Sequence, residues 1–225
     1  LITIGLPSKG RLRDGSIDFL KKNDFKISSN GKERNYFAQI ENFPNIKIIY
    51  LHAKEIIQRL GDGTIDIGVS GLDLLRESSN NLKKKIEVKK KLDFGNADLV
   101  IAVPNDWIDV QTVADLEEVS FDFRDMKNIR LRVATKYPNL TSNFLVAKGV
   151  TQFRLVASLG ATETYPFIGS SEIITDITSS GKTLQDNNLR VLKDGLILNS
   201  TACLFVSKRS IKKTNIRNFL EKIKK

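Results

Sequence analysis

Residues 172–184 contain the residue types of a phosphate-binding loop. An apolar stretch runs into Asp176, and the small residues 178–181 precede Thr183. Such a turn can direct several backbone N–H groups at one anion, and the positive end of a helix opening at Thr183 would face the same point. The Asp176 carboxylate suits the hydroxyl groups of a sugar better than a second phosphate. The segment therefore predicts a site for a ribose 5-phosphate.

Two other interpretations fit parts of this segment. An ordinary polar strand-to-helix turn would have the same Ser- and Gly-rich composition. A P-loop would share its last three positions with Gly181, Lys182 and Thr183. The P-loop is disfavoured, because Asp176 replaces its first glycine and would set a negative charge against nucleotide phosphates. Only 42 residues follow Thr183, too few for the rest of a nucleotide-hydrolysing sheet.

Two cations follow the first expected strand. Lys9 and Arg11 stand at the head of the next helix, where positive charge opposes the helix dipole. A purely structural sequence would avoid that placement, so anion binding is favoured over a solvated face. Ligands of α/β proteins gather at the carboxyl ends of strands, and Asp73 follows another such strand. For Asp73 alone, the first turn of a helix is an equally good interpretation.

Strand-like and helix-like segments alternate along the chain. Short apolar runs predict buried strands at residues 1–6, 46–51, 65–69, 99–103, 130–135, 153–157, 173–176 and 202–206. Helical periodicity is found at residues 12–22, 53–60, 72–77, 140–148, 163–168 and 216–223. This alternation predicts an α/β fold with mainly parallel sheets and helices on both faces.

The composition is that of an ordinary globular protein, with 40% hydrophobic and 28% charged residues among 225. No run of 18 apolar residues occurs, which excludes a membrane helix, and the first residues lack the pattern of a secretory signal. The single cysteine, Cys203, excludes a disulfide framework and a cysteine-built metal site, and it fits a reducing, cytoplasmic compartment. It lies in an apolar run, where an inert buried thiol is expected.

The net charge of +10 calls for an acidic partner. Nucleic acid is the first candidate, but the lysine runs at residues 83–85 and 89–91 contain no interleaved aromatic residues. No zinc-finger, helix-turn-helix or RNA-recognition signature accompanies them. A solvated lysine-rich surface is favoured over binding of nucleic acid or of small polyanions such as ATP and diphosphates.

Six segments, in order and at their spacing, resemble the catalytic subunit of ATP phosphoribosyltransferase, the first enzyme of histidine biosynthesis. The resemblance covers nearly the whole chain. The segments are 6–12 (LPSKGRL), 66–75 (DIGVSGLDLL), 97–104 (ADLVIAVP), 132–140 (RVATKYPNL), 160–163 (GATE) and 176–184 (DITSSGKTL). Each is a weak signal alone, but six together are specific. Residues 96–98 (NAD) stand where many relatives have Cys-Arg, which puts the contacts to ATP there in question.

The resemblance implies transfer of the phosphoribosyl group of PRPP to N1 of ATP, with release of pyrophosphate and a need for Mg²⁺. It implies a two-domain, periplasmic-binding-protein-like (type II) α/β fold with a cleft between the domains. Domain I would be discontinuous, residues 1–98 plus 186–225, and domain II, residues 99–185, would carry the phosphate loop.

The resemblance also assigns roles to residues. The leaving pyrophosphate would face Lys9, Arg11 and Arg34, and Glu163 would lie near the ribose. The contacts to PRPP would come from Asp176, Ile177, Thr178, Ser179, Ser180, Gly181, Lys182 and Thr183. Weaker candidates for the ATP side are Asp73, Asp98, Thr135, Lys136 and Tyr137. No protein side chain would bind Mg²⁺ directly, since the phosphates carry it. Displacement at C1 of ribose needs positioning and neutralisation of charge, not a covalent nucleophile, so the only histidine, His52, is expected to be structural.

The chain ends after the expected C-terminal helix, which fits the short form of the family. The short form works as a homodimer within a hetero-octamer, together with a regulatory subunit that resembles histidyl-tRNA synthetase. Two functions from other classes remain as alternatives. A solute-binding protein would share the fold but should carry an export signal. A nucleic-acid-binding protein would explain the positive charge but not the acid-containing phosphate loop.

Overall fold

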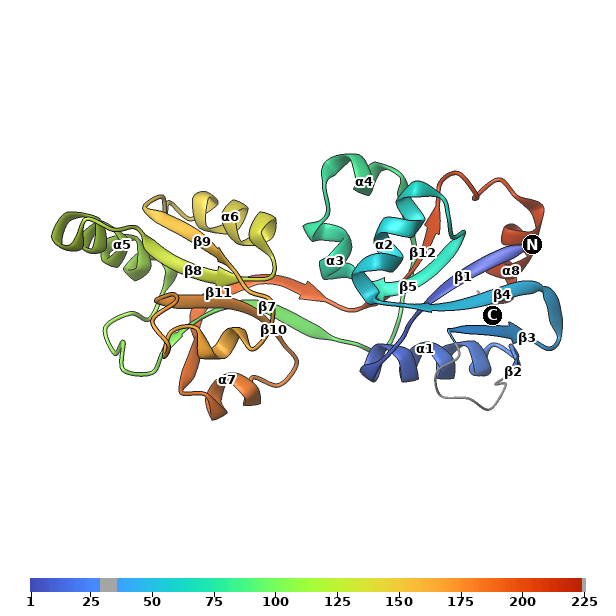
Figure 1. Cartoon of the computed structure of the whole chain (residues 1–225), viewed down its shortest axis with the longest axis horizontal. Coiled ribbons are helices and arrows are strands. Elements are labelled where there is room, and N and C mark those ends of the chain that lie inside the picture. The colour runs from blue at the N-terminus through green and yellow to red at the C-terminus, as the bar shows by residue number, and fades with distance from the viewer. Residues whose placement is uncertain (29–35, 224–225) are drawn as a thin grey trace. The chain divides into compact units, whose positions relative to one another are not determined.

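The computed structural model describes residues 1–28 and 36–223 (Figure 1). The chain divides into two compact units: unit 1 comprises Leu1–Asn96 and Thr201–Lys225, and unit 2 comprises Ala97–Ser200. The expected limits at residues 98 and 186 differ from these. The second differs more, because the long strand β11 (Leu189–Ser200) pairs antiparallel with β7 (Ala97–Pro104) and therefore packs with unit 2.

In the described part of unit 1, seven strands form one mixed sheet in the order β2-β3-β4-β1-β5-β12-β6. Their bounds are β1 (Ile2–Pro7), β2 (Ile27–Ser28), β3 (Phe37–Ile40), β4 (Phe43–Leu51), β5 (Ile67–Gly71), β6 (Ile86–Lys91) and β12 (Ala202–Ser207). The central strand β1 is parallel to both β4 and β5, which brings the carboxyl ends of all three to one edge.

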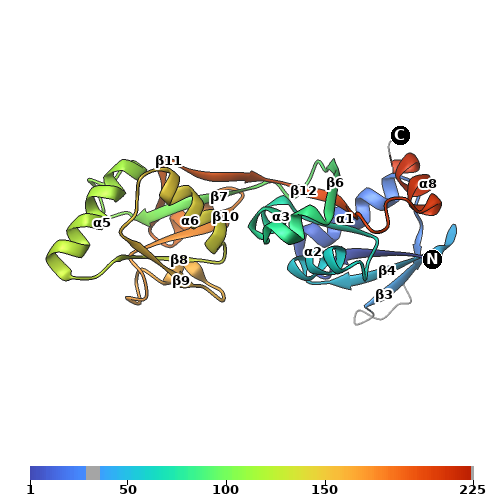
Figure 2. The same ribbon diagram turned by 90° about the horizontal axis from the view of Figure 1, so that it is seen from above.

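Helices cover both faces of this sheet (Figures 1 and 2). Alternate residues of β1 and β12 pack with α1 (Gly10–Lys22) and α8 (Thr214–Ile223) on one face. On the other face, α2 (Ala53–Asp62) and α3 (Leu72–Glu77) pack with the remaining residues of β12, near the short helix α4 (Asn80–Lys84). The period-2 alternation of a strand allows one sheet to supply two cores.

A buried carboxylate ties the C-terminal segment to the start of this sheet. The two oxygens of Asp66 accept hydrogen bonds from Thr3 N at 2.8 Å, from Ser210 Oγ at 2.5 Å and from Lys213 Nζ at 2.7 Å. Burial favours the neutral acid, but the hydrogen bonds from Lys213, Ser210 and Thr3 outweigh it and lower the pKa of Asp66.

Unit 2 is built on a five-stranded sheet in the order β11-β7-β10-β8-β9, with β8 (Leu131–Thr135), β9 (Phe153–Ala157) and β10 (Ile173–Thr178) parallel to one another. One face packs against α5 (Val113–Lys127) and α6 (Pro138–Ala147). The other face packs against Leu184 of α7 (Lys182–Asp186) and against Tyr165.

Two expectations about the elements are wrong, and the sequence did not predict helix α5. The sheets are mixed rather than mainly parallel, because β3, β6, β11 and β12 each run antiparallel to a neighbour. Residues 163–168 form only the 3₁₀ turn η1 (Thr162–Thr164) followed by turns, not a helix. The 15-residue helix α5 was missed, since its buried residues are only Val113, Leu116 and Ser120 and its helical periodicity is weak.

Candidate active site

Most of the expected site residues of unit 2 lie at one edge of its sheet, where the parallel strands β8, β9 and β10 end. Thr135 of β8 is in register with Thr175 of β10 and with Ala157 of β9. The segments that follow these strands therefore lie at the same edge. Asp98, at the start of the antiparallel strand β7, is in register with Thr178 and reaches this edge too.

The loop after β10 is the expected phosphate loop. Gly181 has φ +73° and caps α7, which begins at Lys182, one residue before the expected start, and is only five residues long. The loop is held by its own hydroxyl groups: Gly181 N donates to Thr178 Oγ1 at 2.9 Å, and Lys182 N donates to Ser180 Oγ at 3.4 Å. A Cβ atom added at Gly181 would meet nothing within 4 Å. The outer side of this turn is therefore open to a ligand.

A chain of polar groups holds Asp176 near the end of β10, two residues beyond which the strand ends at Thr178. The Asp176 residue is only 6% exposed, and its Oδ1 accepts from Ile177 N at 2.8 Å. The hydroxyl of Thr162, which is fully buried, hydrogen-bonds to the same carboxylate and lies 2.8 Å from Ser158 Oγ. Because these partners leave the carboxylate few orientations, Asp176 is positioned in advance for a ligand at the edge.

The electrostatics of Asp176 set it apart from an exposed carboxylate. Burial is the largest influence and raises its pKa, and the neighbouring Glu163 carboxylate raises it further. The ammonium group of Lys136 and the N–H of Ile177 act in the opposite direction without cancelling the rise. Glu163 and Lys136 thus both lie within electrostatic range of Asp176. A carboxylate in this setting would gain stability from a cationic ligand.

Beneath this edge, three buried threonines form a ring of hydrogen bonds. Thr175 Oγ1 donates to Thr135 Oγ1 at 2.6 Å, and Thr141 Oγ1 lies 2.7 Å from Thr175 Oγ1 and 3.2 Å from Thr135 Oγ1. Tyr137 N also donates to Thr135 Oγ1, at 2.9 Å. Thr135 and Tyr137 are 2% and 7% exposed. The ring ties β8, β10 and the start of α6 together, so the contribution of Thr135 is to position this edge.

Asp98 has a side-chain partner on the neighbouring strand. Asn199 Nδ2 donates to Asp98 Oδ1 at 2.7 Å, and the two residues are in register between β7 and β11. Asp98 is half-buried, with one oxygen engaged in this way.

In unit 1, Lys9, Arg11 and Asp73 lie at the carboxyl edge of the parallel strands. Lys9 is the N-cap residue of α1, whose first turn contains no acidic residue, and Lys9 and Arg11 are exposed. Asp73 is 6% exposed, and its carboxylate lies over Gly71 so closely that a Cβ there would collide with it. The predicted Arg34 lies outside the described residues.

Two other predictions from the sequence concern reactive side chains. His52 is a helix cap, with Nδ1 accepting from Lys54 N at 3.3 Å, so its expected structural role is confirmed. Cys203 is fully buried, and burial raises the pKa of its thiol to about 11, as an inert thiol requires. In residues 1–28 and 36–223, no group of three or more His, Cys, Asp and Glu could hold a metal ion. No helix in this part of the chain is long and apolar enough to cross a membrane.

Sequence reasoning missed the residues that position the site. Ser158, Thr141, Thr175 and Asn199 act only through their partners in the fold. Thr162 lies within the 160–163 segment, but no role could be given to it without its contact with Asp176 in the fold. A polar residue at or just after a strand end, as at Ser158, was the one local signal available.

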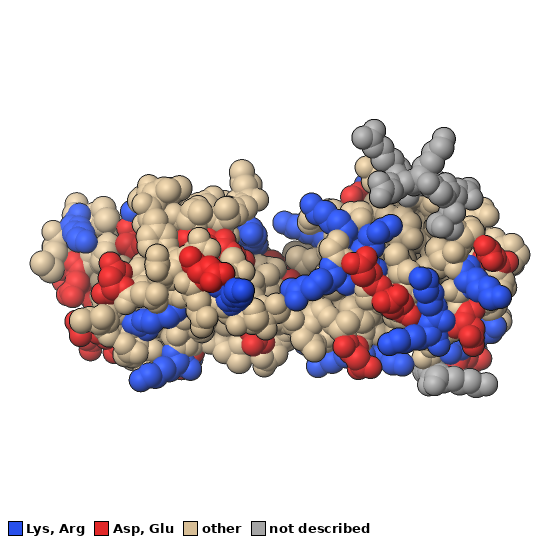
Figure 3. Space-filling view, turned by 90° about the horizontal axis from the view of Figure 1, so that it is seen from below, with Lys and Arg blue, Asp and Glu red and all other residues tan. Residues whose placement is uncertain are grey.

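The net positive charge of the chain belongs to unit 1. Unit 1 has 26 Lys and Arg against 13 Asp and Glu, a net charge of +13, whereas unit 2 has 10 against 13, a net charge of −3. Figure 3 shows basic side chains concentrated over unit 1 on the face that it presents. The net charge therefore attracts polyanionic ligands to unit 1, whereas a phosphate at unit 2 would depend on local groups.

Comparisons with known proteins agree with this geometry. A family profile described as HisG: ATP phosphoribosyltransferase matches residues 52–225. The ATP phosphoribosyltransferase of Mesorhizobium japonicum is 46% identical over 211 residues, which cover 93% of this chain and 91% of that protein.

Two solved structures share the fold. A chain of the HisG:HisZ ATP phosphoribosyl transferase complex from Thermotoga maritima has a TM-score of 0.75 at 24% identity, with 100% of this chain and 97% of that chain covered. The substrate-binding protein of an amino acid ABC transporter has a TM-score of 0.57 at 14% identity, with 99% and 91% covered. Such likenesses show the fold alone, which is the periplasmic-binding-protein-like (type II) α/β fold that the resemblance implied.

The profile match and the identity over nearly the whole chain decide between the alternatives. They favour neither a solute-binding protein nor a nucleic-acid-binding protein. The chain belongs to the ATP phosphoribosyltransferase family and is a transferase of histidine biosynthesis.

Proposed function

We propose that the edge of unit 2 binds the phosphoribosyl group of PRPP and that the chain transfers it to N1 of ATP. The observation that carries this proposal is the buried Asp176 held beside the open turn at Gly181. The turn, with its hydroxyl and N–H groups, would hold the 5-phosphate through residues 177–183. Asp176 would accept hydrogen bonds from the ribose hydroxyls, and Glu163 would lie next to them.

The chemistry needs charge stabilisation rather than a covalent step. As the bond from C1 to pyrophosphate breaks, the ribose becomes oxocarbenium-like and positive, and the leaving group becomes more negative. The negative carboxylates of Asp176 and Glu163 stabilise this positive charge. The repulsion between the two carboxylates is relieved when the cationic sugar forms. This arrangement stabilises the transition state more than the ground state, as catalysis requires.

The departing pyrophosphate would be neutralised by Lys9, Arg11 and Arg34. The net charge of +13 on unit 1 supports this assignment, since it attracts both polyanionic substrates. ATP would contact Asp73, Asp98 and Lys136. Thr135 and Tyr137 would contribute by fixing the edge from beneath, because both are buried.

Mg²⁺ would enter the site on the phosphate oxygens of PRPP and ATP. This proposal fits the donors present, because two neighbouring carboxylates, Asp176 and Glu163, can accept hydrogen bonds from water on the ion but do not form a closed cage. The ion would screen the charge of the pyrophosphate as it leaves.

We further propose that the chain works with a regulatory subunit resembling histidyl-tRNA synthetase, as a homodimer within a hetero-octamer in the cytoplasm. The fold shared with a chain of the Thermotoga maritima HisG:HisZ complex supports this proposal. Mass measurement after mixing the chain with such a subunit would test the assembly, and two separate, unmixed species would contradict it.

The catalytic proposal is tested by mixing the protein with PRPP, ATP and Mg²⁺ and following pyrophosphate release together with the absorbance of phosphoribosyl-ATP. Asp176→Asn keeps the shape of the side chain but removes its charge, so we expect the rate to fall by about 10²-fold or more. A matched control is Asp125→Asn, because Asp125 is an exposed carboxylate of α5 in the same unit. Wild-type turnover by Asp176→Asn would refute the role of this carboxylate.

A further inference from the structure

The head of helix α1 carries the two cations Lys9 and Arg11, and it packs against the segment through which the chain leaves unit 1. We call residues 92–96 the exit segment, because the residue that follows them belongs to unit 2. Leu12 and Gly15 lie about one turn apart in α1, and both approach the exit segment closely. Since Leu12 follows Arg11 directly, this contact lies within about one helical turn of both cations.

Two glycines allow the close approach. Gly15 faces Phe94, and a Cβ atom at residue 15 would lie 2.3 Å from Phe94 Cδ2 and 2.7 Å from Phe94 Cγ. Gly95 faces Leu12, where a Cβ atom would lie 2.7 Å from Leu12 Cδ2. Carbon atoms in favourable contact are about 3.5–4.0 Å apart. Helix and segment therefore interlock, with no room for a methyl group at either glycine.

Strand β12 holds the exit segment in place. The hydroxyl of Thr201 is directed at two carbonyl groups, Leu92 O at 2.8 Å and Phe94 O at 3.0 Å. Ala202 N also donates to Phe94 O at 3.1 Å, and Leu92 N donates to Ala202 O at 2.8 Å. Leu92 is 5% exposed and belongs to the main core of unit 1, and Phe94 packs against that core. Phe94 thus offers α1 a fixed surface.

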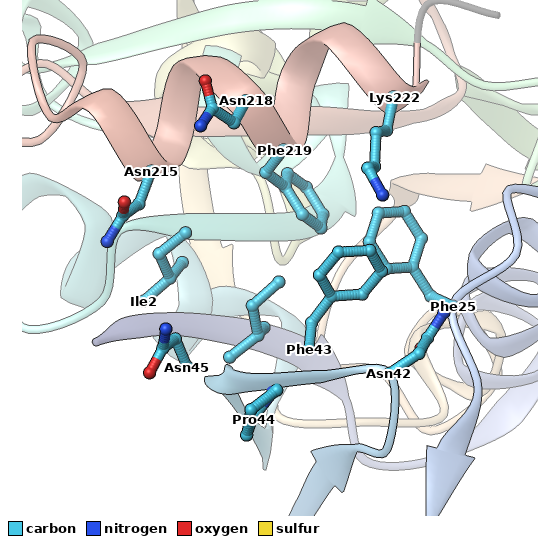
Figure 4. Close-up of a pocket in the computed structure, with 11 residues that line it drawn as sticks. Ile2, Phe25, Asn42, Phe43, Pro44, Asn45, Asn215, Asn218, Phe219 and Lys222 are labelled. Atoms are coloured by element: carbon cyan, nitrogen blue, oxygen red, sulfur yellow. The ribbon is translucent and has the colours of Figure 1, made fainter.

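The other end of α1 is fixed as well. Leu20 and Phe25 are each 1% exposed, and Phe25 N donates to Leu20 O at 3.0 Å. Figure 4 shows Phe25 beside Phe43 and Phe219, with ring centroids 5.2 and 4.8 Å from its own. This end cannot shift without opening the main core. A collision at Gly15 would therefore displace the head of the helix.

We propose that Phe94 is a positioning residue for the transfer reaction, because it holds the head of α1 where Lys9 and Arg11 face the pyrophosphate. This inference rests on the proposed role of the two cations. Their charges repel each other and oppose the helix dipole, and the first turn of α1 contains no acidic residue. Electrostatics alone would thus disperse the two cations. The packing of Leu12 and Gly15 on the exit segment keeps them together.

Gly15→Ala tests the proposal, because helix propensity and the contact predict opposite results. Alanine is the better helix former, but its Cβ atom would collide with Phe94. We expect the Kd of the full chain for magnesium pyrophosphate, measured by isothermal titration, to rise about tenfold, as for cations misplaced by a fraction of an ångström. Ribose 5-phosphate, which the proposed function assigns to unit 2, should bind with an unchanged Kd.

Gly61→Ala is the matched control. Gly61 is also a helical glycine of unit 1, and a Cβ atom there would lie 1.9 Å from Leu82 Cδ1. It stands near the end of α2, eight residues or about 12 Å along the helix from Ala53, which follows the carboxyl end of β4. This variant creates a similar collision away from the two cations. It should bind pyrophosphate as the unaltered chain does.

A double-mutant cycle identifies Phe94 as the cause. Phe94→Ala should by itself weaken pyrophosphate binding, because the head of α1 loses its support. Adding Gly15→Ala to Phe94→Ala should weaken binding no further, since the ring that the new Cβ atom would meet is absent. Additive losses in the double variant would overturn the proposal.

Arg11→Ala separates this inference from the proposed function. If Arg11→Ala binds pyrophosphate as tightly as the unaltered chain, both the role of Arg11 and the inference are wrong. If Arg11→Ala weakens binding but Gly15→Ala does not, only the positioning role of Phe94 is overturned. Equal losses for pyrophosphate and ribose 5-phosphate in Gly15→Ala would also overturn it, because the collision would then disturb the whole fold.

Discussion

The backbone conformation of Gly181 gives the sharpest test of the phosphate loop. Its φ of +73° lies in the left-handed region, while a Cβ at this position would meet nothing within 4 Å. A side chain at residue 181 would therefore destabilise this loop conformation through backbone strain, and not through a collision with other protein atoms. A residue other than glycine costs about 1–2 kcal/mol in this region, and a β-branched residue is the least suited to it.

The perturbation is Gly181→Val, compared with Gly181→Asn, because asparagine enters the left-handed region more readily. If only the left-handed loop binds PRPP, a penalty of about 1–2 kcal/mol lowers the competent fraction and raises the apparent Kd about 5- to 30-fold. The asparagine variant should lose clearly less affinity. Isothermal titration with PRPP and Mg²⁺ measures both, and circular dichroism verifies that each variant is folded.

Gly169 provides a matched control in the same unit. Its φ is +71°, and a Cβ there would likewise meet nothing within 4 Å. Gly169→Val therefore imposes similar strain away from the loop and should leave the Kd for PRPP unchanged. The reasoning is refuted if Gly181→Val binds PRPP normally, or if valine and asparagine at residue 181 weaken binding equally, since strain would then not be the cause.

Three more outcomes are expected. Thr162→Val should move the acidic limb of the kcat/KM pH profile to higher pH, because it removes a hydrogen bond that lowers the pKa of Asp176. Thr162→Ser keeps the hydroxyl and should retain the original profile. If the acidic limb does not move in Thr162→Val, the positioning role of Thr162 is contradicted. Asp66→Asn should lower the free energy of unfolding in urea at pH 7 by about 2–3 kcal/mol. The folded-state pKa of Asp66 is lowered. The stabilisation is therefore complete above the unfolded-state pKa of about 3.9 and is lost as the pH falls through the folded-state pKa. A difference in unfolding free energy between the variant and the unaltered chain that persists at lower pH would argue against the assignment. Arg11→Ala should slow pyrophosphate release by about 10²–10³-fold, whereas Lys212→Ala, also in unit 1, should have no effect; equal rates for the two variants would remove Arg11 from the reaction.

The parts of the fold that follow local rules could be predicted from the sequence. The strand at Phe153–Ala157 and the helix at Leu72–Glu77 have the predicted bounds, because apolar periodicity marks them. The placement of Gly181 in the turn after a strand followed from the same local signals, although the strand continues two residues beyond the expected end at Asp176. Edge strands such as β6 were missed, since its exposed lysines hide the strand pattern.

The remainder of the site depends on contacts between distant residues. The capping box of Thr112 and Asp115 could have revealed α5. In contrast, no local pattern pairs Asp98 with Asn199, which lie 101 residues apart in sequence. The return of the chain at Thr201 was also beyond local rules, because β11 is assigned to unit 2 only by its pairing with β7.

The threonine ring beneath the edge of unit 2 has a consequence for how its members can change. Thr135, Thr141 and Thr175 satisfy one another's hydroxyl groups out of contact with water. Replacing one by valine leaves a donor and an acceptor stranded, while replacing all three removes every group that needs a partner except the N–H of Tyr137. The three positions are therefore energetically coupled, so the cost of the triple replacement should be smaller than the sum of the single ones. Because each single replacement is costly, the three threonines are expected to be retained together or replaced together.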